Sequence, residues 1–489
     1  MLFNSHIFML LFLPLLLAGW YFLNWKKKFQ LAQGYLIGMS LWFYAYANLQ
    51  YLWLLLFSCL IGWLLSCLPE KISSEKGKKV LTGVGCVFHL GLLGYFKYSN
   101  FFLENLNTVF HTDFPMLQIL LPVGISFYTF QQLAYLIDRC RGDAPRDSFF
   151  DYLTFMVYFP QLLQGPILLR SEFMGQLKEP ERRRFHAERF SEGIQFFVFG
   201  LAKKVLLADT LAKAVNYGYS NVSMLDSISA LLLAVGYLTE LYFDFSGYCD
   251  MAVGLGKMIG LEVAENFDAP FHSASVKEFW RRWHMTLGRF FTRYVYIPLG
   301  GNRRGKMRTL CNVMIVMLLS GLWHGAAWTF VLWGFLHGVG MIWDNLEHPH
   351  LPKKWMRQAA TFAYVCMTFV FFRAESIAQG IDVLKSIVSL KWNGFVFQMA
   401  SALDMTECYI ITKALSMKLP GLLSWFWLGI FVVLIAICFR VLSGKKVSGV
   451  VALQKQKGYG RLYPVVLAVL FTWSMISMTG VSEYLYFSF

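Results

Sequence analysis

The residues of this chain that could carry out acid–base chemistry gather in one stretch, residues 271–343. It contains His284 in the run EFWRRWHMTLGR, beside tryptophan and arginine side chains, and His324 in the run GLWHGAAW, flanked by Gly321 and Gly325. A histidine can take a proton from a hydroxyl near neutral pH, and neighbouring glycines leave room for a substrate to approach. Ionisable side chains are costly to bury in an apolar chain, so this cluster predicts a functional site.

Simpler explanations exist for both runs. His324 also fits a histidine at a helix end that is solvated or hydrogen-bonded and takes no part in chemistry. The arginines around His284, such as Arg281 and Arg282, fit an interfacial amphipathic helix whose side chains bind anionic lipid. That explanation accounts for the arginines as well as an active site does, but it accounts less well for His284.

Acidic side chains near the ends of apolar segments are expected to be structural. Asp244 and Asp250 lie in YFDFSGYCD, and Asp138 lies in LIDRCRGD beside two arginines. Most such carboxylates pair with an arginine or cap a helix. The run LGGNRRG has neither P-loop nor dinucleotide-binding spacing, and no G-x-S-x-G nucleophile motif occurs. His272 and His337 have no partners at metal-ligand spacing, so we expect no metal.

The composition places these residues in a membrane protein. Of 489 residues, 57% are hydrophobic, 18% aromatic and only 15% charged, and the mean hydropathy is +0.49. The formal net charge of +15 would indicate nucleic acid for a soluble protein. Here the basic residues lie in short connections between apolar segments, where they orient helices, so nucleic acid is not expected as a partner. The nine cysteines are odd in number and form no C-x-x-C pair, so neither a disulfide framework nor a zinc site is expected.

Apolar windows near the length that crosses about 30 Å of hydrocarbon predict an all-α polytopic membrane protein with about 11–12 transmembrane helices. The windows are residues 7–23, 33–47, 51–68, 80–96, 116–137, 194–208, 228–243, 310–322, 328–343, 359–372, 422–439 and 463–478. With the N-terminus outside, the inner connections carry 35 lysine and arginine residues and the outer ones carry seven. Because basic loops stay inside, both termini are predicted to be extracytoplasmic. The opening MLFNSHIFMLLFLPLLLAGWYFL lacks a basic n-region and a cleavage pattern, which favours a retained first span.

Two regions depart from simple spans. Residues 149–172 are apolar but are interrupted by two prolines and a glycine, which predicts a re-entrant hairpin that lines a cavity. Residues 262–309 are predicted to lie as helices in the membrane interface, with arginine head groups that reach water. The chain ends in a short aromatic tail, residues 480–489, and residues 1–489 are expected to form a single membrane domain.

Together the motifs resemble a known family. The runs FPQLLQGPILLR, YFDFSGYCDMAVGLGKMIG, NFDAPFHSASVKEFWRRWHMTLGRFFTRYVYIPLGGNRRG, GLWHGAAWTFVLWGFLHG and the terminal EYLYFSF are similar, in this order, to the bacterial branch of the membrane-bound O-acyltransferase (MBOAT) family. Within the family, the chain resembles the membrane subunits that O-acetylate alginate or peptidoglycan, and the resemblance covers nearly the whole chain. The chain departs from the family pattern at residues 290–294. Relatives commonly have W-F-R-D-Y there, whereas this chain has FFTRY, so the acidic residue of that motif is missing.

The resemblance implies a fold and a set of site residues. The fold is a ring of helices around a thinned centre, with funnels from both membrane faces that meet near a histidine. The two motif histidines of the family correspond to His284 and His324, and His324 is implied as the catalytic one. In some relatives a terminal aromatic motif takes the acyl group on a tyrosine, which corresponds here to Tyr486; the alternative is a tail that simply lies at the interface. The implied acyl donor is acetyl-CoA, with no metal, and arginines suit its phosphate groups. The donor-binding residues we expect on the inner face are Arg281, Arg282, Trp283, Arg303 and Arg304.

The function implied is that of an enzyme in the bacterial cytoplasmic membrane. It would move an acetyl group from a cytoplasmic thioester across the membrane, for O-acetylation of an extracytoplasmic polysaccharide through an esterase-like acyltransferase partner of the same pathway. D-alanyl transfer to teichoic acid by the same mechanism is an alternative. The competing class is a transporter or flippase of a lipid-linked substrate, which paired broken helices in inverted repeats would indicate. The interrupted segment 149–172 has no convincing twin elsewhere in the sequence.

Overall fold

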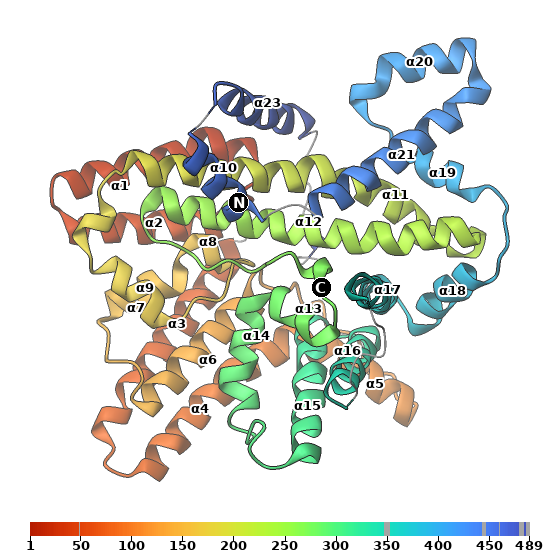
Figure 1. Ribbon diagram of the computed structural model, residues 1–489. Helices are drawn as coiled ribbons and strands as arrows, with labels where there is room; N and C mark the ends of the chain where they lie inside the picture. Colours follow the sequence, from red (N-terminus) through yellow and green to blue (C-terminus); the bar gives the residue numbers. More distant parts are fainter. Residues whose placement is uncertain (48, 347–352, 443–445, 459, 479–483, 486–489) are drawn as a thin grey trace. The chain divides into compact units, whose positions relative to one another are not determined.

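The structure is a computed structural model that describes residues 1–47, 49–346, 353–442, 446–458, 460–478 and 484–485. The described residues form helices and no strand (Figure 1). The predicted all-α fold is therefore confirmed, while the ring around a central funnel stays a prediction. By their internal contacts the described residues form two compact units.

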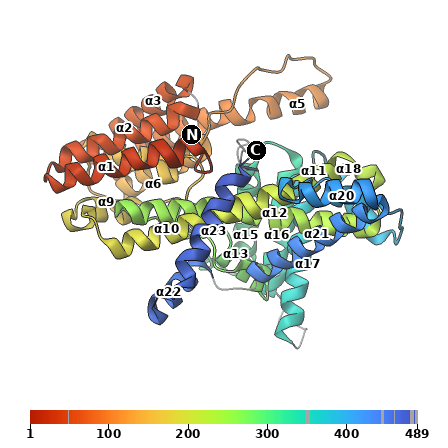
Figure 2. The ribbon, with the colours of Figure 1, turned by 90° about the horizontal axis from the view of Figure 1, so that it is seen from above.

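Unit 1 comprises Met1–Phe197, Tyr248–Glu265 and Thr286–Pro298. Helices α1, α2 and α3 lie side by side at its N-terminal end (Figure 2). Helix α4 packs on α6. Its core holds clustered aromatic rings, for example Phe3, Phe43 and Phe159, which are fully buried. The helices of this unit are α1 (Leu13–Trp25), α2 (Phe29–Ala47), α3 (Leu52–Cys67), α4 (Glu75–Leu93), α5 (Ser99–Phe110), α6 (Ile125–Arg141), α7 (Phe149–Val157), α8 (Phe159–Leu162), α9 (Arg170–Leu177), most of α10 (Ala187–Ala202) and most of α14 (Met285–Phe291).

Unit 2 comprises Val198–Gly247, Asn266–Met285 and Leu299–Phe489. It contains both motif histidines, His284 and His324. Helix α12, whose last residues belong to unit 1, is the longest helix in this part of the structure. The helices are α11 (Asp209–Ser220), α12 (Ser227–Ile259), α13 (Val276–Arg282), α15 (Lys306–His324), α16 (Trp328–Leu346), α17 (Lys354–Arg373), α18 (Ile377–Val388), α19 (Phe395–Ser401), α20 (Tyr409–Lys418), α21 (Pro420–Leu442), α22 (Val447–Lys457) and α23 (Leu462–Ser477).

The apolar windows correspond to helices, and six helical segments of the described chain are long and apolar enough to cross a membrane. They are Phe8–Trp25, Leu49–Lys71, Glu75–Phe110, Ser227–Ile259, Lys306–His324 and Pro420–Val441. In the window 116–137 the helix begins only at Ile125. Pro122 and Gly124 precede it, and Gly124 has a φ of +78°, a conformation that a helix cannot continue through.

The interrupted segment 149–172 is buried but not continuously helical. Helix α7 ends at Val157, α8 is a single turn, and residues 163–169 have no helical structure. A Cβ atom at Gly165 would lie 2.2 Å from the carbonyl oxygen of Pro160, so glycine is required where the chain folds back. The predicted interruption is confirmed; its re-entry into a membrane stays a prediction.

Candidate functional site

Helices α15 and α16 form an antiparallel hairpin that carries His324 at its turn (Figure 1). The two helices approach closely because glycines face each other across the contact. A Cβ atom at Gly321 would lie 2.3 Å from the carbonyl oxygen of Phe330, and one at Gly334 would lie 2.5 Å from that of Met317. Small residues at helix contacts are how membrane helices achieve such close approach. Helix α15 ends at His324, and residues 325–327 connect it to α16.

Replacing Gly334 by valine is expected to push the two helices apart. The side chain would meet backbone atoms of α15, which cannot rotate away, so we expect a loss of about 1–3 kcal/mol of stability and reduced activity. The measurement is the thermal denaturation temperature of the purified protein in detergent. Gly83→Val in α4, where an added Cβ meets no atom within 4 Å, is the matched control. Equal denaturation temperatures for the two variants would contradict the close packing.

His324 is enclosed by aromatic rings. Its side chain is buried at 3% exposure. The ring centroids of Trp323, Trp333 and Phe372 lie 5.0, 5.1 and 5.1 Å from that of His324. These rings exclude water from much of the imidazole and restrict its rotation. A base held in this way can act on a hydroxyl that enters in a fixed position.

His284 lies where the chain turns sharply between α13 and α14. Its φ of +45° is in the left-handed region, which is uncommon for a residue other than glycine. Helix α13 ends at Arg282, and the next residue, Trp283, is already extended. The backbone N–H of Met285 donates to the carbonyl oxygen of Asn266 at 3.0 Å and holds the turn. Trp280, His284 and Leu287 therefore do not lie on one continuous helix, because the chain leaves the helical conformation at Trp283 and His284.

The turn brings the two motif histidines together. The ring centroids of His284 and His324 lie 6.4 Å apart. His284 is completely buried, and the ring of Phe245 packs edge-on against it at 4.8 Å. A residue held in a rare backbone conformation inside a core costs free energy, and such residues cluster at functional sites.

Burial lowers the pKa of His284 to about 3. When the pH falls below 6.5, the ordinary pKa of a histidine, His284 takes up a proton in the unfolded chain but not in the folded chain. The stability that neutral His284 contributes is therefore complete above pH 6.5 and declines as the pH falls toward 3. We expect the denaturation temperature of the native protein to fall more steeply between about pH 7 and about pH 4 than that of His284→Asn, since asparagine tolerates the left-handed conformation. Parallel curves would contradict a buried neutral imidazole.

His337 is a third buried histidine, which the sequence analysis set aside. The indole N–H of Trp280 donates to its Nδ1 at 3.2 Å. The hydroxyl of Thr368 donates to the carbonyl oxygen of Val365, so its oxygen is left to accept from Nε2 of His337 at 2.9 Å. His337 is thus a neutral imidazole that supports Trp333, whose ring lies 4.8 Å away and also contacts His324. In the sequence, this role of His337 was indicated only by its spacing of four residues from Trp333, which places the two side chains next to each other on one helix.

The five residues predicted to bind the donor differ in their surroundings. Arg281 is exposed, as are Arg303 and Arg304 in the turn before α15. Arg282 pairs with Glu278 at 2.8 Å. Trp283 is buried among rings, with Phe279 stacked at 5.3 Å, and this position favours packing.

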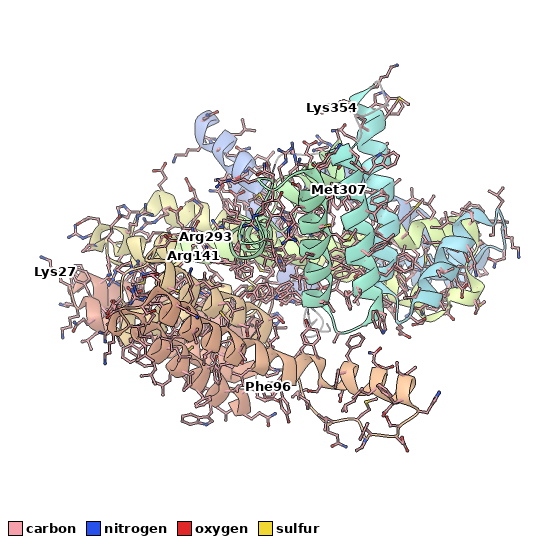
Figure 3. All side chains as sticks on the ribbon, turned by 90° about the horizontal axis from the view of Figure 1, so that it is seen from below. Lys27, Phe96, Arg141, Arg293, Met307 and Lys354 are labelled. Carbon is pink, nitrogen blue, oxygen red and sulfur yellow. The ribbon has the colours of Figure 1, made fainter. Side chains whose placement is uncertain are left out.

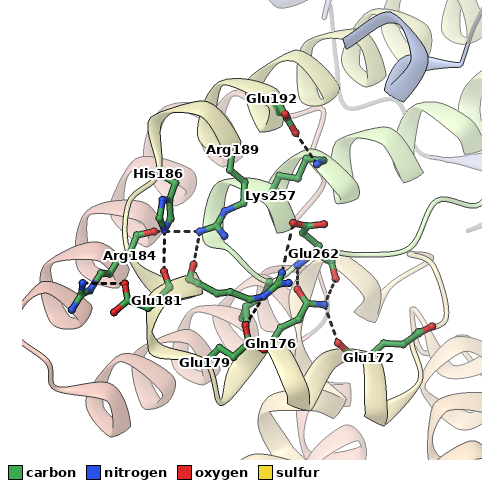
Figure 4. A network of polar contacts seen from close by, with 12 residues as sticks. Glu172, Gln176, Glu179, Glu181, Arg184, His186, Arg189, Glu192, Lys257 and Glu262 are labelled. Carbon is green, nitrogen blue, oxygen red and sulfur yellow. Dashed lines mark hydrogen bonds and ion pairs between the residues drawn. The ribbon is translucent and has the colours of Figure 1, made fainter. Parts of the chain in front are cut away.

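Several other basic residues, in unit 1, are paired with carboxylates. Arg293 Nη2 lies 2.9 Å from Asp138 Oδ1 and 3.1 Å from Asp143 Oδ2, and Arg141 lies beside it (Figure 3). Asp138 therefore has the arginine partner that we expected, although that arginine is 155 positions away. Arg289 forms two hydrogen bonds with the carboxylate of Glu172. Figure 4 shows the neighbouring network, in which Lys257 Nζ lies 3.0 Å from Glu192 and the backbone of Glu262 is bonded to Gln176.

A polar cavity of about 720 Å³ lies next to the aromatic enclosure of His324. Phe330 and Phe372 form part of its wall, and Phe372 contacts the His324 ring. Charged side chains line the remainder, including Lys204, Asp244 and Glu240, and so does Leu485 of the C-terminal tail. The sequence analysis missed Lys204, because the two adjacent lysines inside this apolar window, Lys203 and Lys204, carried no motif. Within the described residues no group of three or more histidine, cysteine or acidic side chains is placed to hold a metal.

Comparison with known proteins supports the resemblance. Residues 141–380 match the model of the membrane-bound O-acyltransferase family, MBOAT. The chain is 35% identical over 423 residues to a peptidoglycan O-acetyltransferase of Helicobacter pylori, covering 80% of each chain. It is 39% identical over 389 residues to a probable alginate O-acetylase of Azotobacter vinelandii, covering 77% of this chain and 76% of that protein. A teichoic acid D-alanyltransferase of Streptococcus thermophilus is 28% identical over 253 residues, or 49% of this chain and 58% of that one.

Proposed function

Because this chain belongs to the membrane-bound O-acyltransferase family and is a multi-pass membrane acyltransferase, we propose that it transfers an acetyl group from cytoplasmic acetyl-CoA toward an extracytoplasmic polysaccharide. The identity with a peptidoglycan O-acetyltransferase and with a probable alginate O-acetylase supports both the acetyl group and the polysaccharide. The observation that carries the proposal is the arrangement of His324, buried among aromatic rings and 6.4 Å from His284.

In the proposed reaction His324 is the general base and Tyr486 is the first acceptor; Tyr486 lies outside the described residues. The hydroxyl oxygen attacks the thioester carbonyl carbon while His324 takes the hydroxyl proton. The carbon–sulfur bond then breaks, and the proton passes from His324 to the departing thiolate. The products are a tyrosyl ester and a free thiol. Attack on this ester by a hydroxyl of an extracytoplasmic acyltransferase partner, or of the polysaccharide, restores the tyrosine.

His284 acts in this scheme through its position rather than through its charge. Its low pKa keeps the imidazole neutral at physiological pH, so it places no second positive charge beside His324 as that residue takes up a proton. On the donor side, the exposed residues Arg281, Arg303 and Arg304 are available to phosphate groups of acetyl-CoA, with Arg282 and Trp283 as the remaining proposed donor residues.

Release of free thiol from acetyl-CoA by the purified protein in detergent tests the proposed function. We expect thiol release that depends on His324. No release from acetyl-CoA, with release from a D-alanyl carrier thioester instead, would favour D-alanyl transfer, in line with the similarity to a teichoic acid D-alanyltransferase. No release from either donor would exclude both and favour the transporter.

We place the protein in the bacterial cytoplasmic membrane with both termini outside. Two cysteine positions test this orientation: the half-buried Cys408 belongs to an outer connection, and Ser73 is exposed in an inner one. In a background in which the other cysteines are replaced, a membrane-impermeant maleimide added to intact cells is expected to label Cys408. It should label Ser73→Cys only after the cells are opened. The reverse pattern would invert the topology.

A further inference from the structure

Lys204 and Asp244 form a buried ion pair that the proposed chemistry does not use. Lys204 Nζ lies 2.6 Å from Asp244 Oδ1 and 2.8 Å from Asp209 Oδ1, and the Lys204 and Asp244 side chains are each 2% exposed. Lys204 belongs to a π-helical turn, Lys203–Ala208, that follows α10, and such turns are frequent at functional sites. The attraction within a buried ion pair offsets only part of the free energy that is lost when the two charges are desolvated. Ionisable residues buried within a membrane protein therefore indicate function.

Both members of this pair also contact the C-terminal tail. Asp244 Oδ2, the oxygen that does not face Lys204, accepts the backbone N–H of Leu485 at 3.0 Å. Lys204 Nζ lies 4.6 Å from the centre of the Tyr484 ring, and Tyr484 is completely buried. The hydrogen bond to Asp244 holds the main chain of the tail, so it does not depend on the side chain at position 485. The contact with Lys204 favours an aromatic ring over an aliphatic side chain at position 484.

The bound part of the tail lies at the cavity next to His324. Leu485 lines this cavity together with Phe330 and Phe372. The ring of Phe372 lies 5.1 Å from His324. In the sequence, the residue after Leu485 is Tyr486, the proposed acyl acceptor.

We propose that Lys204 and Asp244 are a docking site for the C-terminal tail of the chain, and that they are positioning residues for acyl transfer. The ligand is a polypeptide segment with an aromatic residue over the lysine, followed by a free backbone N–H for the carboxylate. Fixing Leu485 sets the register of the tail and thereby which of its hydroxyl groups is offered to His324. This role in acyl transfer rests on the proposed function, whereas the docking itself does not.

Protection of the tail from carboxypeptidase tests the docking without any acyl donor. The full-length protein in detergent is digested, and loss of C-terminal residues is followed by intact-protein mass spectrometry. We expect the native tail to resist removal of Leu485 and Tyr484. Asp244→Ala and Lys204→Met should lose these residues at least about tenfold faster, because each removes a contact of the tail to a charged group. Asp244→Asn keeps an acceptor oxygen, so its rate of digestion should lie between those of the native protein and Asp244→Ala.

Glu240→Gln is the matched control. Glu240 lies one helical turn before Asp244 on α12, is equally buried and lines the same cavity, whereas the carboxylate that accepts the N–H of Leu485 is that of Asp244. Glu240→Gln should protect the tail as the native protein does. Thermal denaturation first establishes that Asp244→Ala is folded. If its tail then resists carboxypeptidase as well as the native tail does, the docking site is overturned. The same holds if the tail of Glu240→Gln is digested as fast as that of Asp244→Ala.

A second measurement connects docking to acyl transfer. In Asp244→Ala the rate of thiol release from acetyl-CoA should fall together with tail protection. Unchanged thiol release from an unprotected tail would overturn the positioning role and leave the docking intact. If the native protein releases no thiol from any donor, the proposed function fails, and the protection assay still decides the docking.

Discussion

Replacing His324 by glutamine is expected to reduce thiol release from acetyl-CoA by about 10²–10⁴-fold, the usual contribution of a positioned general base. Glutamine keeps much of the volume between Trp323, Trp333 and Phe372, but it cannot take a proton from a hydroxyl. The rate constant at saturating acetyl-CoA should fall, whereas donor affinity should change little, because His324 acts on the hydroxyl rather than on the phosphates.

His89→Gln is the control for this variant. His89 lies in α4 of unit 1 and is buried at 1% exposure, so its replacement perturbs a comparably enclosed histidine outside the proposed site. We expect His89→Gln to keep the native rate. A His324→Gln protein that turns over donor at more than about a tenth of the native rate would remove His324 as the base, since a general base contributes at least about 10²-fold.

Replacing Tyr486 by phenylalanine is expected to abolish the rapid first turnover. If Tyr486 is the acceptor, mixing native protein with excess acetyl-CoA releases one thiol per protein in a fast phase, followed by slower release as the tyrosyl ester is hydrolysed. Phenylalanine has the same ring without the hydroxyl, so the fast phase should disappear. Rapid mixing with a thiol-reactive dye measures both phases.

Tyr484→Phe separates this effect from a disturbed tail. Tyr484 is buried with its ring over Lys204, and phenylalanine retains that contact. The fast phase should therefore persist in Tyr484→Phe. A fast phase of native size in Tyr486→Phe would show that the acyl group goes elsewhere, and the tail would then be an interfacial segment without a chemical role.

The local features of the fold were predictable from the sequence because they depend on neighbouring residues. Apolar windows predicted the helices, and the prolines and glycine of the segment 149–172 predicted its interruption. The glycines beside His324 were expected to leave room for a substrate, whereas Gly321 faces the backbone of Phe330 in α16, where no side chain fits. The helices and the interruption each follow from helix geometry or from glycine and proline sterics within a few residues.

The remaining features depend on contacts between distant residues, which periodicity does not encode. Nothing in the sequence near His284 signalled its left-handed backbone or the extended Trp283 before it, which together separate α13 from α14. The partner of Lys204 is 40 positions away, and that of Asp138 is 155 positions away. The acidic residue of the family motif is missing beside Arg293, and the fold supplies a carboxylate, Asp138, from α6 instead.

Acetylation of Tyr486 can be measured by mass spectrometry of the tail after the protein is incubated with acetyl-CoA. We expect one acetyl group on Tyr486 in the native protein, none in His324→Gln, and reduced acetylation in Asp244→Ala. The peptide is isolated under mildly acidic conditions that preserve a tyrosyl ester. Turnover of acetyl-CoA by the native protein without acetylation of Tyr486, or acetylation that is equal in His324→Gln, would contradict the proposed reaction.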